Sequence, residues 1–243
     1  MRAARCQMQA KVVMVMDWKR TLAMWAGTDA FKSKLHEAER IIGEALATHD
    51  KPYVAYSGGK DSSCMLHLVL RRCPDIMVLH WDYGPYYIPD WLRSEFIENA
   101  KKIGAVNLRI ETSKDYLRLK RHAINVLGRE YMGKLIPSLA SEGYDLCFVG
   151  LRREESLKRR RRIDAKKSIT EIPECWPLAN WSWRDVWAYI FAKNIPYASI
   201  YDIYAPVVGW DKARLVTFFD PEFNHLGASN LDGVLMWKFK NMQ

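Results

Sequence analysis

Cysteines are few in this sequence, and long apolar runs are missing. Five cysteines occur among 243 residues, and no two of them form a Cys-x-x-Cys pair, so we expect neither a zinc site nor an iron–sulfur cluster. No stretch approaches the ~20 uncharged apolar residues of a membrane-spanning helix, and a signal-peptide pattern is also missing. These absences predict a cytoplasmic protein with reduced thiols and no membrane partner.

Acidic residues are outnumbered by basic ones, 28 against 37, which gives a formal net charge of +9. This excess favours an anionic partner without identifying it. Hydrophobic residues make up 49% of the chain and include 10 Trp, 12 Tyr and 8 Phe, which excludes intrinsic disorder. A length of 243 residues suits one large domain, or a domain with an appendage.

Short apolar runs alternate with helical patterns through the middle of the chain. The runs typical of strands are 53–56, 76–81, 107–111 and 145–149. Helical spacing occurs in 29–48, in the segment after residue 59, and in 91–103, 115–142 and 183–193. Strands that alternate with helices at this spacing predict βαβ units. We therefore expect an α/β, Rossmann-like fold with a mostly parallel sheet and helices on both faces.

The patterns divide the chain into three parts. Residues 1–28 form a basic, Met-rich N-terminal appendage, and residues 29–205 form the α/β domain. Residues 206–243 form a C-terminal extension, rich in Phe, Trp and Lys, that matches no known pattern. We expect this extension to shape an acceptor site or the interface of a homo-oligomer.

The segment Ser57-Gly58-Gly59-Lys60-Asp61-Ser62 follows a predicted strand and opens a predicted helix. Its two glycines allow unusual backbone angles and the close approach of an anion. The N–H groups and the dipole of the helix start favour that anion, and the serine hydroxyls and Lys60 add donors and charge. The segment therefore predicts a phosphate or pyrophosphate site. It has neither the spacing of a Walker A loop nor a G-x-G-x-x-G fingerprint.

With Tyr56 in front, this segment resembles the PP-loop of the adenine-nucleotide α-hydrolase superfamily, which includes N-type ATP pyrophosphatases and the phosphoadenosine phosphosulfate (PAPS) reductase family. Residues 150–156 (Gly-Leu-Arg-Arg-Glu-Glu-Ser) are similar to the Gly-x-Arg-x-x-x-Ser segment of PAPS reductases and of the small subunit of sulfate adenylyltransferase. Residues 177–202 resemble the family's run from Pro-Leu to Tyr-Asp, and residues 82–84 (Asp-Tyr-Gly) its Asp-Thr-Gly beside the adenine. The resemblance covers about residues 50–205.

One departure from the family concerns the catalytic thiol. PAPS reductases carry a Cys in a C-terminal Glu-Cys-Gly-x-His-type motif, whereas this chain has no cysteine after Cys175. A thiolate must attack sulfur for the reduction to start. The resemblance therefore extends to the fold and the nucleotide site, while the reductase activity does not carry over; Cys175 could substitute for the missing thiol only if its loop reached the site.

The resemblance implies chemistry at the α-phosphate of ATP or of a related adenylyl nucleotide (adenylyl sulfate or PAPS), with release of pyrophosphate and transfer of the adenylyl group to an unidentified acceptor. Lys60 would neutralise charge on the leaving group, and Arg152 and Arg153 would clamp a phosphate or sulfate. These three are the predicted catalytic residues. The predicted nucleotide-binding residues are Ser57, Gly58, Gly59, Lys60, Asp61, Ser62, Ser63, Asp82, Gly150, Arg152 and Arg153.

Two carboxylates leave alternatives open. Asp61 could help to hold Mg²⁺, which favours one or two carboxylates together with phosphate oxygens, or it could only stabilise the start of the helix. Asp82 could share the metal or be a turn residue. The metal prediction is thus Asp61 as a candidate Mg²⁺ ligand.

A basic run from Arg152 to Lys167 holds much of the positive charge. It could bind nucleic acid, or form a solvated loop over an anionic small-molecule site, and its start inside the phosphate motif favours the loop. Four tryptophans between 176 and 187 could stack on bases, but packing is favoured because Trp183 and Trp187 are four residues apart on one helix face.

The sequence leaves three functions open. The first is an enzyme that acts on ATP or a related adenylyl nucleotide. The second is a sulfonucleotide reductase with a non-standard thiol. The third is a nucleic-acid-binding accessory protein of a DNA- or RNA-modification system that retains a PP-loop fold.

Overall fold

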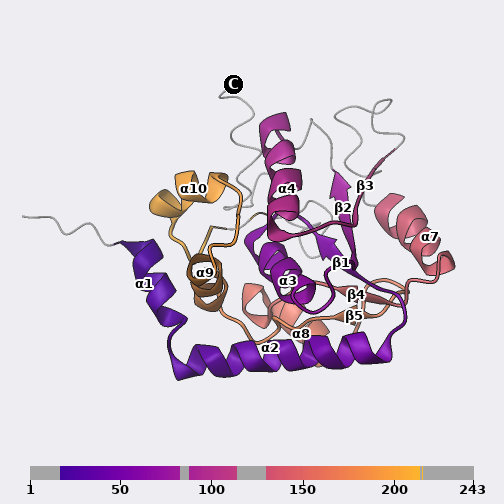
Figure 1. Cartoon of the computed structure of the whole chain (residues 1–243), viewed down its shortest axis with the longest axis horizontal. Helices are drawn as coiled ribbons and strands as arrows, with labels where there is room; N and C mark the ends of the chain where they lie inside the picture. Colours follow the sequence, from indigo (N-terminus) through magenta and orange to yellow (C-terminus); the bar gives the residue numbers. More distant parts are fainter. Residues whose placement is uncertain (1–16, 83–87, 114–129, 214, 216–243) are drawn as a thin grey trace, which may run out of the picture.

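A five-stranded parallel sheet lies at the centre of the structure, a computed structural model that describes residues 17–82, 88–113, 130–213 and 215 (Figure 1). Its strands lie in the order β3-β2-β1-β4-β5, and every neighbouring pair is parallel. The strands are β1 (Pro52–Tyr56), β2 (Met77–Asp82), β3 (Leu108–Thr112), β4 (Leu146–Phe148) and β5 (Glu174–Cys175). The predicted α/β fold with a parallel sheet is confirmed.

Helices connect the strands and pack around the sheet. They are α1 (Trp18–Trp25), α2 (Asp29–Thr48), α3 (Lys60–Leu70), α4 (Asp90–Ile103), α7 (Ile136–Ser141), α8 (Leu157–Asp164), α9 (Trp183–Ala192) and α10 (Ile200–Val208). A π-helical turn, η2 (Tyr131–Leu135), precedes α7, and a 3₁₀ turn, η3 (Arg153–Glu155), precedes α8. No helix within these described ranges is long and apolar enough to cross a membrane.

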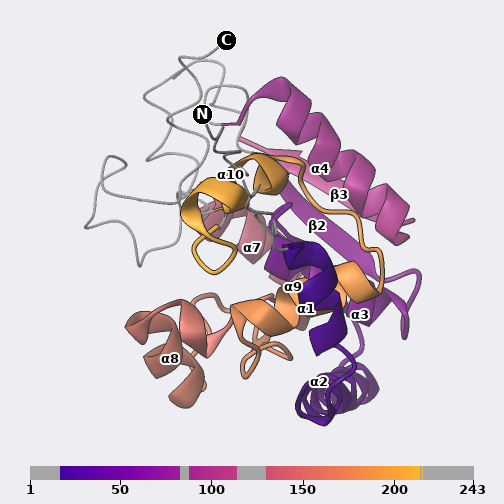
Figure 2. The same ribbon diagram turned by 90° about the vertical axis from the view of Figure 1, so that its left-hand side faces the viewer.

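Successive side chains of each strand point to opposite faces of the sheet. On one face, the Tyr56 hydroxyl donates to the carbonyl oxygen of Phe96 in α4, at 3.1 Å. On the other face, Trp81 packs edge-on against Tyr131 in η2, with ring centroids 5.5 Å apart. Helical elements therefore cover both faces, as expected from right-handed crossovers (Figure 2).

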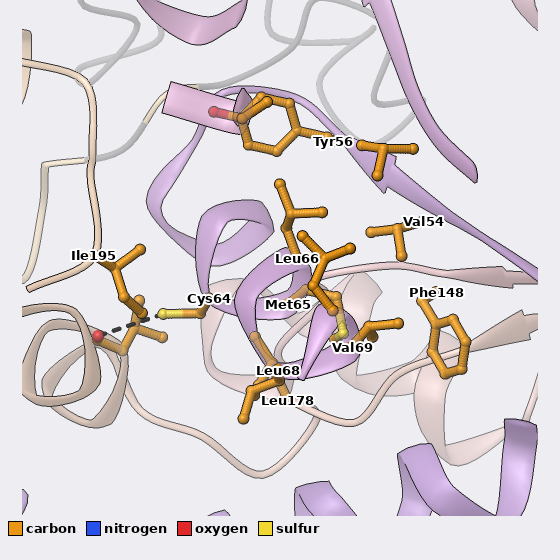
Figure 3. Packing of buried hydrophobic residues seen from close by; sticks show 14 of the residues in the cluster. Val54, Tyr56, Cys64, Met65, Leu66, Leu68, Val69, Phe148, Leu178 and Ile195 are labelled. Atoms are coloured by element: carbon orange, nitrogen blue, oxygen red, sulfur yellow. Dashed lines mark hydrogen bonds between the residues drawn. The ribbon is translucent and has the colours of Figure 1, made fainter. Parts of the chain in front are cut away.

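Helix α3 is the most deeply buried connection. Nine of its eleven residues are buried, and it packs against β1 on one side and α9 on the other. Its Cys64 thiol donates to the carbonyl oxygen of Val186 in α9, at 3.5 Å, and its Met65 and Val69 lie near Val54 and Phe148 of the sheet (Figure 3). The start of α3 is thereby fixed relative to the strand that precedes it.

The strand order changes direction between β1 and β4. The connections after β1 lead toward β2 and β3, whereas the later part of the chain adds β4 and β5 on the other side. In parallel α/β sheets, ligands bind outside the carboxyl ends of the strands at such a switch point. The segments that follow β1 and β4, at residues 57 and 149 onward, meet at this place.

Several elements differ from the sequence-based expectation. Residues 18–25 of the appendage are helical, because Asp17 caps α1 by accepting from the Arg20 amide. The predicted loop that follows residue 156 is helix α8, since the Ser156 side chain accepts from the Arg159 amide and starts it. Part of the predicted helical region 115–142 and most of the predicted C-terminal extension lie outside the described residues, and the division into three parts stays a prediction.

A buried carboxylate ties α1 and α2 to α9. Asp185 is fully buried and accepts from Trp25 Nε1 at 2.8 Å and from Lys34 Nζ at 2.6 Å. It also accepts from the amide and the hydroxyl of Ser182, at 2.7 and 2.8 Å. Burial alone would raise the pKa of Asp185, but the hydrogen bonds from Lys34, Ser182 and Trp25 outweigh burial and lower it.

We expect Asp185→Asn to lower the free energy of unfolding at neutral pH by about 2 kcal/mol, because an amide cannot accept every one of these bonds. The pKa of Asp185 is lower in the folded protein than in the unfolded chain. The stabilisation that ionised Asp185 provides is therefore complete above about pH 4 and is lost as the pH falls through the folded pKa. Urea unfolding at several pH values measures this difference, which should shrink on acidification.

The control for this variant is Glu98→Gln, which removes an exposed carboxylate 3.7 Å from Lys102 in α4. Its effect should stay below about 0.5 kcal/mol. Equal effects of the two substitutions, or a difference for Asp185→Asn that does not depend on pH, would show that Asp185 does not anchor these helices.

Candidate nucleotide site

A pocket opens at the switch point of the sheet. Its polar wall includes Ser57, Gly59, Asp61, Ser62, Gly150, Glu155, Arg159, Arg162 and Glu174. Its apolar part includes Ala55, Leu79, Trp81, Met132, Ile136 and Val149. Apolar surface with a few convergent polar groups is typical of sites for small molecules.

The phosphate loop forms one wall of this pocket. Gly58 has a φ of +79°, and a Cβ there would lie 2.3 Å from the ring of Phe96, so only glycine fits. The hydroxyl of Ser57 donates to Ser62 Oγ at 3.1 Å, and the hydroxyl of Ser62 donates to the Gly59 carbonyl at 2.8 Å. These bonds hold the loop in a closed turn.

The start of α3 is suited to an anion. Gly59 is the N-cap of α3 and has no side chain that could accept hydrogen bonds from the amide groups of the first turn. A bound anion can accept from such groups instead. The Lys60 amide donates to the Tyr201 hydroxyl at 3.2 Å. That hydroxyl also accepts from the amide of Leu215, another pocket residue, at 3.3 Å.

Asp61 joins the two predicted phosphate segments. One of its carboxylate oxygens accepts from Lys60 Nζ at 3.0 Å, and the other accepts from Arg152 Nε at 2.5 Å. Burial alone would raise the pKa of Asp61, but the charges of Arg152 and Lys60 hold it well below its usual range. The carboxylate is therefore ionised at neutral pH, and the three groups together carry one net positive charge.

The predicted catalytic cations lie beneath the pocket surface. Lys60 is 1% exposed and its Nζ lies 5.9 Å from the ring centroid of Tyr201. Arg152 is 4% exposed, and its Nη1 has no hydrogen-bond partner within the described part of the chain. Arg153 instead points to the surface, where its Nε donates to Asp164 at 2.8 Å and its Nη1 donates to Asn180.

Two further predicted nucleotide-binding residues, Asp82 and Ser63, do not line the pocket and form other hydrogen bonds. Asp82, at the end of β2, accepts from Arg93 Nε at 2.8 Å and from Arg93 Nη2. The Ser63 hydroxyl donates to the Gly59 carbonyl at 3.1 Å and is fully buried. Tyr83 and Gly84 of the predicted Asp-Tyr-Gly match lie outside the described residues. The structure thus brings Ser57, Gly59, Asp61, Ser62 and Gly150 together at the pocket wall.

The ion pairs of Asp61 argue against its alternative role as a Mg²⁺ ligand. Both carboxylate oxygens already accept from cations, and a metal ion would have to compete with Lys60 and Arg152. Among the residues that the structure describes, no group of three His, Cys, Asp or Glu side chains could hold a metal. This donor set does not fit a resident magnesium ion, and we assign no step to one.

The thiols of the pocket region are poor nucleophiles. Cys175, the residue on which a reductase activity would depend, lies in β5 and is absent from the pocket wall. Burial raises its pKa to about 12. Cys147 in β4 does line the pocket, and burial raises its pKa above the ordinary value as well. Both thiols are thus protonated at neutral pH.

The basic run separates into two faces of α8. Arg159 and Arg162 line the pocket, whereas Arg160 and Arg161 are exposed. Arg159 pairs with Glu155, and Arg162 with Glu174. In the sequence-based prediction the whole run is a loop over the site, and these two pocket residues are not singled out. The three-residue spacing of Arg159 and Arg162, which places both on one helix face, is the signal that would have found them.

Comparisons with known proteins agree with the motifs. Residues 51–211 match the family model of the phosphoadenosine phosphosulfate reductase domain. Sulfate adenylyltransferase subunit 2 of Rhizobium sp. (strain BR816) is 28% identical over 208 residues, which cover 68% of this chain and 65% of that protein. The corresponding protein of Brucella ovis is 29% identical over 203 residues, with the same coverage. The chain therefore spans just under two thirds of the length of these curated relatives.

Among solved structures, the phosphate complex of phosphoadenylyl-sulfate reductase from Candida auris is similar, with a TM-score of 0.48 and 17% sequence identity. The match covers 69% of this chain and 84% of that chain.

Gly150 sets how closely the segment after β4 approaches the phosphate loop. A Cβ at this position would lie 2.8 Å from the backbone carbon and oxygen of Asp61. We expect Gly150→Ala to push the two segments apart, to lower the free energy of unfolding by about 1–3 kcal/mol, and to weaken nucleotide binding. Urea unfolding and titration calorimetry measure the two effects.

Gly43→Ala is the matched control, because Gly43 lies within α2 and a Cβ there meets nothing within 4 Å. This substitution should stabilise the protein by about 0.5–1 kcal/mol. If Gly150→Ala were equally stabilising, the two segments could not be in close contact.

Proposed function

The chain belongs to the phosphoadenosine phosphosulfate reductase domain family, and on this premise we propose that it is an enzyme that binds ATP or a related adenylyl nucleotide and acts at the α-phosphate. In this proposal pyrophosphate leaves, and the adenylyl group passes to an acceptor. The supporting relatives are named as adenylyltransferases, although the chain spans only 65% of their length.

The observation that carries the proposal is the meeting of two phosphate-type segments at the switch point of the sheet. The loop before α3 and the Gly150 segment share one pocket wall, and Asp61 links them through Lys60 and Arg152. This is the position where parallel α/β folds bind their ligands. The net positive charge of the linked groups and the dipole of α3 both favour a phosphate there.

The proposed reaction requires these residues to hold the phosphates and to stabilise the leaving group. The acceptor forms a bond to the α-phosphorus while the bond from that phosphorus to the bridging oxygen breaks, and the oxygen leaves with its electron pair as part of pyrophosphate. The loop around Ser57 and Gly59 would hold the phosphates in place. The buried charges of Lys60 and Arg152 would stabilise the negative charge that develops on the leaving group. Their burial keeps this field strong, because water is excluded from them.

The alternative reductase function has less support. It requires a thiolate, and the pKa values of Cys147 and Cys175 are raised by burial. Adenylyl chemistry requires no thiol, so this family member is better suited to transfer than to reduction.

We expect the full chain to bind ATP, adenylyl sulfate or PAPS, and to release pyrophosphate from ATP when an acceptor is present. Lys60→Ala should reduce the rate of pyrophosphate release at least about 100-fold, since an electrostatic stabiliser of a leaving group is typically worth this much. Calorimetry with the three nucleotides and a pyrophosphate assay measure these outcomes.

The control is Lys32→Ala, which removes an exposed lysine from α2 and should leave both binding and rate unchanged. Thermal unfolding of each variant separates a loss of activity from a loss of fold. Failure of all three nucleotides to bind the wild-type protein would refute the proposed function.

A further inference from the structure

The pocket has a second cationic wall, formed by α8. Arg159 and Arg162 are three residues apart on this helix, so both point to the same side, and both line the pocket. Their side chains are 17% exposed, which leaves each accessible but largely enclosed. Arg161, between them in sequence, is exposed on a different side of the same helix.

Arg162 is held in a defined orientation. Its Nη2 donates to Glu174 Oε2, and its Nε donates to the carbonyl oxygen of Lys167 at 3.3 Å. Glu174 Oε2 also accepts from Trp176 Nε1 at 2.8 Å, and the guanidinium carbon of Arg162 lies 5.6 Å from the Trp176 ring centroid. Glu174 and Trp176 therefore fix the planar guanidinium, which is the state that best binds an oxyanion.

Glu174, the partner of Arg162, lies well away from the phosphate loop. Glu174 in β5 is level with Cys147 in β4, and Cys147 is level with Tyr53 in β1. Two strand spacings separate β5 from β1, or about 10 Å at ~4.8 Å per strand. Ser57 is four residues beyond Tyr53, about 13 Å further along the strand direction. On these spacings the backbone of Glu174 lies about 16 Å from that of Ser57, so a phosphate held at Ser57 does not reach Glu174.

Each arginine of the α8 wall is paired with a carboxylate, Arg159 with Glu155 and Arg162 with Glu174. A guanidinium group has five N–H donors, so one that is paired and oriented by a carboxylate has further donors for an oxyanion.

We propose that Arg162, oriented by Glu174 and Trp176, binds a second phosphate or sulfate group of the nucleotide, distinct from the group held at the phosphate loop. This inference rests on the proposed function and names a specificity residue for it. Two sources supply such a group: the end of a 5′-polyphosphate chain, as in ATP, or a phosphate on the ribose, as in adenosine 3′,5′-bisphosphate. AMP, with one phosphate, contains neither.

The experiment compares the affinities of AMP, ATP and adenosine 3′,5′-bisphosphate for wild-type protein and for Arg162→Gln. We expect wild-type protein to bind ATP or the bisphosphate more tightly than AMP. Arg162→Gln should weaken the tighter ligand by about 10- to 100-fold, the value of a charged hydrogen bond, and leave AMP within about twofold. The nucleotide that loses affinity identifies the source of the second group.

Arg161→Gln is the matched control on the other side of α8 and should leave all three affinities within about twofold. Arg162→Lys keeps the charge but not the planar fork, so it should fall between wild type and Arg162→Gln. Thermal unfolding of the same variants measures how much the Arg162–Glu174 pair contributes to the stability of the fold.

Equal wild-type affinities for the three nucleotides would overturn the inference. Equal losses for all three in Arg162→Gln, or no loss with a lowered melting temperature, would do the same and would show that the Arg162–Glu174 pair is only structural. These outcomes leave nucleotide binding itself intact, so they differ from failure of the proposed function, in which wild-type protein binds none of the three.

Discussion

The buried ion pairs of Asp61 are the interaction on which the candidate site depends. Asp61 lies in the first turn of α3, whereas Arg152 follows β4, 91 residues later in the chain. Removing one partner from a buried pair leaves an uncompensated charge at a cost of about 3–5 kcal/mol, so neither Asp61 nor Arg152 can be replaced alone. Lys60 adds the second positive charge. The same contacts that close the fold at the switch point therefore leave a positive potential beneath the phosphate loop.

Much of this arrangement could be predicted from the sequence. The alternation of apolar runs and helical patterns gave the parallel α/β sheet, because burial on both faces makes parallel strands continuously apolar. Ser57 to Ser62 and Gly150 to Ser156 could be placed near one another, since the carboxyl ends of parallel strands meet at one edge. The requirement for glycine at Gly58 and Gly150 also follows from the motifs, although the contacts with Phe96 and Asp61 do not.

The rest of the site could not be predicted, because it depends on contacts between residues that are far apart in the sequence. Lys60 and Arg152 are basic residues in a phosphate motif, and nothing in their spacing shows that both are buried against Asp61. The run from Arg159 to Arg162 has a uniform composition, so composition could not divide it into a pocket face and an exposed face. The spacing of Arg159 and Arg162 places them on one helix face, but only the structure shows that this face meets Glu174, from a two-residue strand.

Phosphate should bind where the start of α3 meets the Gly150 segment. A crystal structure of the full chain with a non-hydrolysable ATP analogue would show this binding site. We expect phosphate oxygens within hydrogen-bonding distance of the backbone between Ser57 and Ser62, with Asp61 still paired to Lys60 and Arg152. An analogue bound elsewhere, with this loop unoccupied, would contradict this expectation.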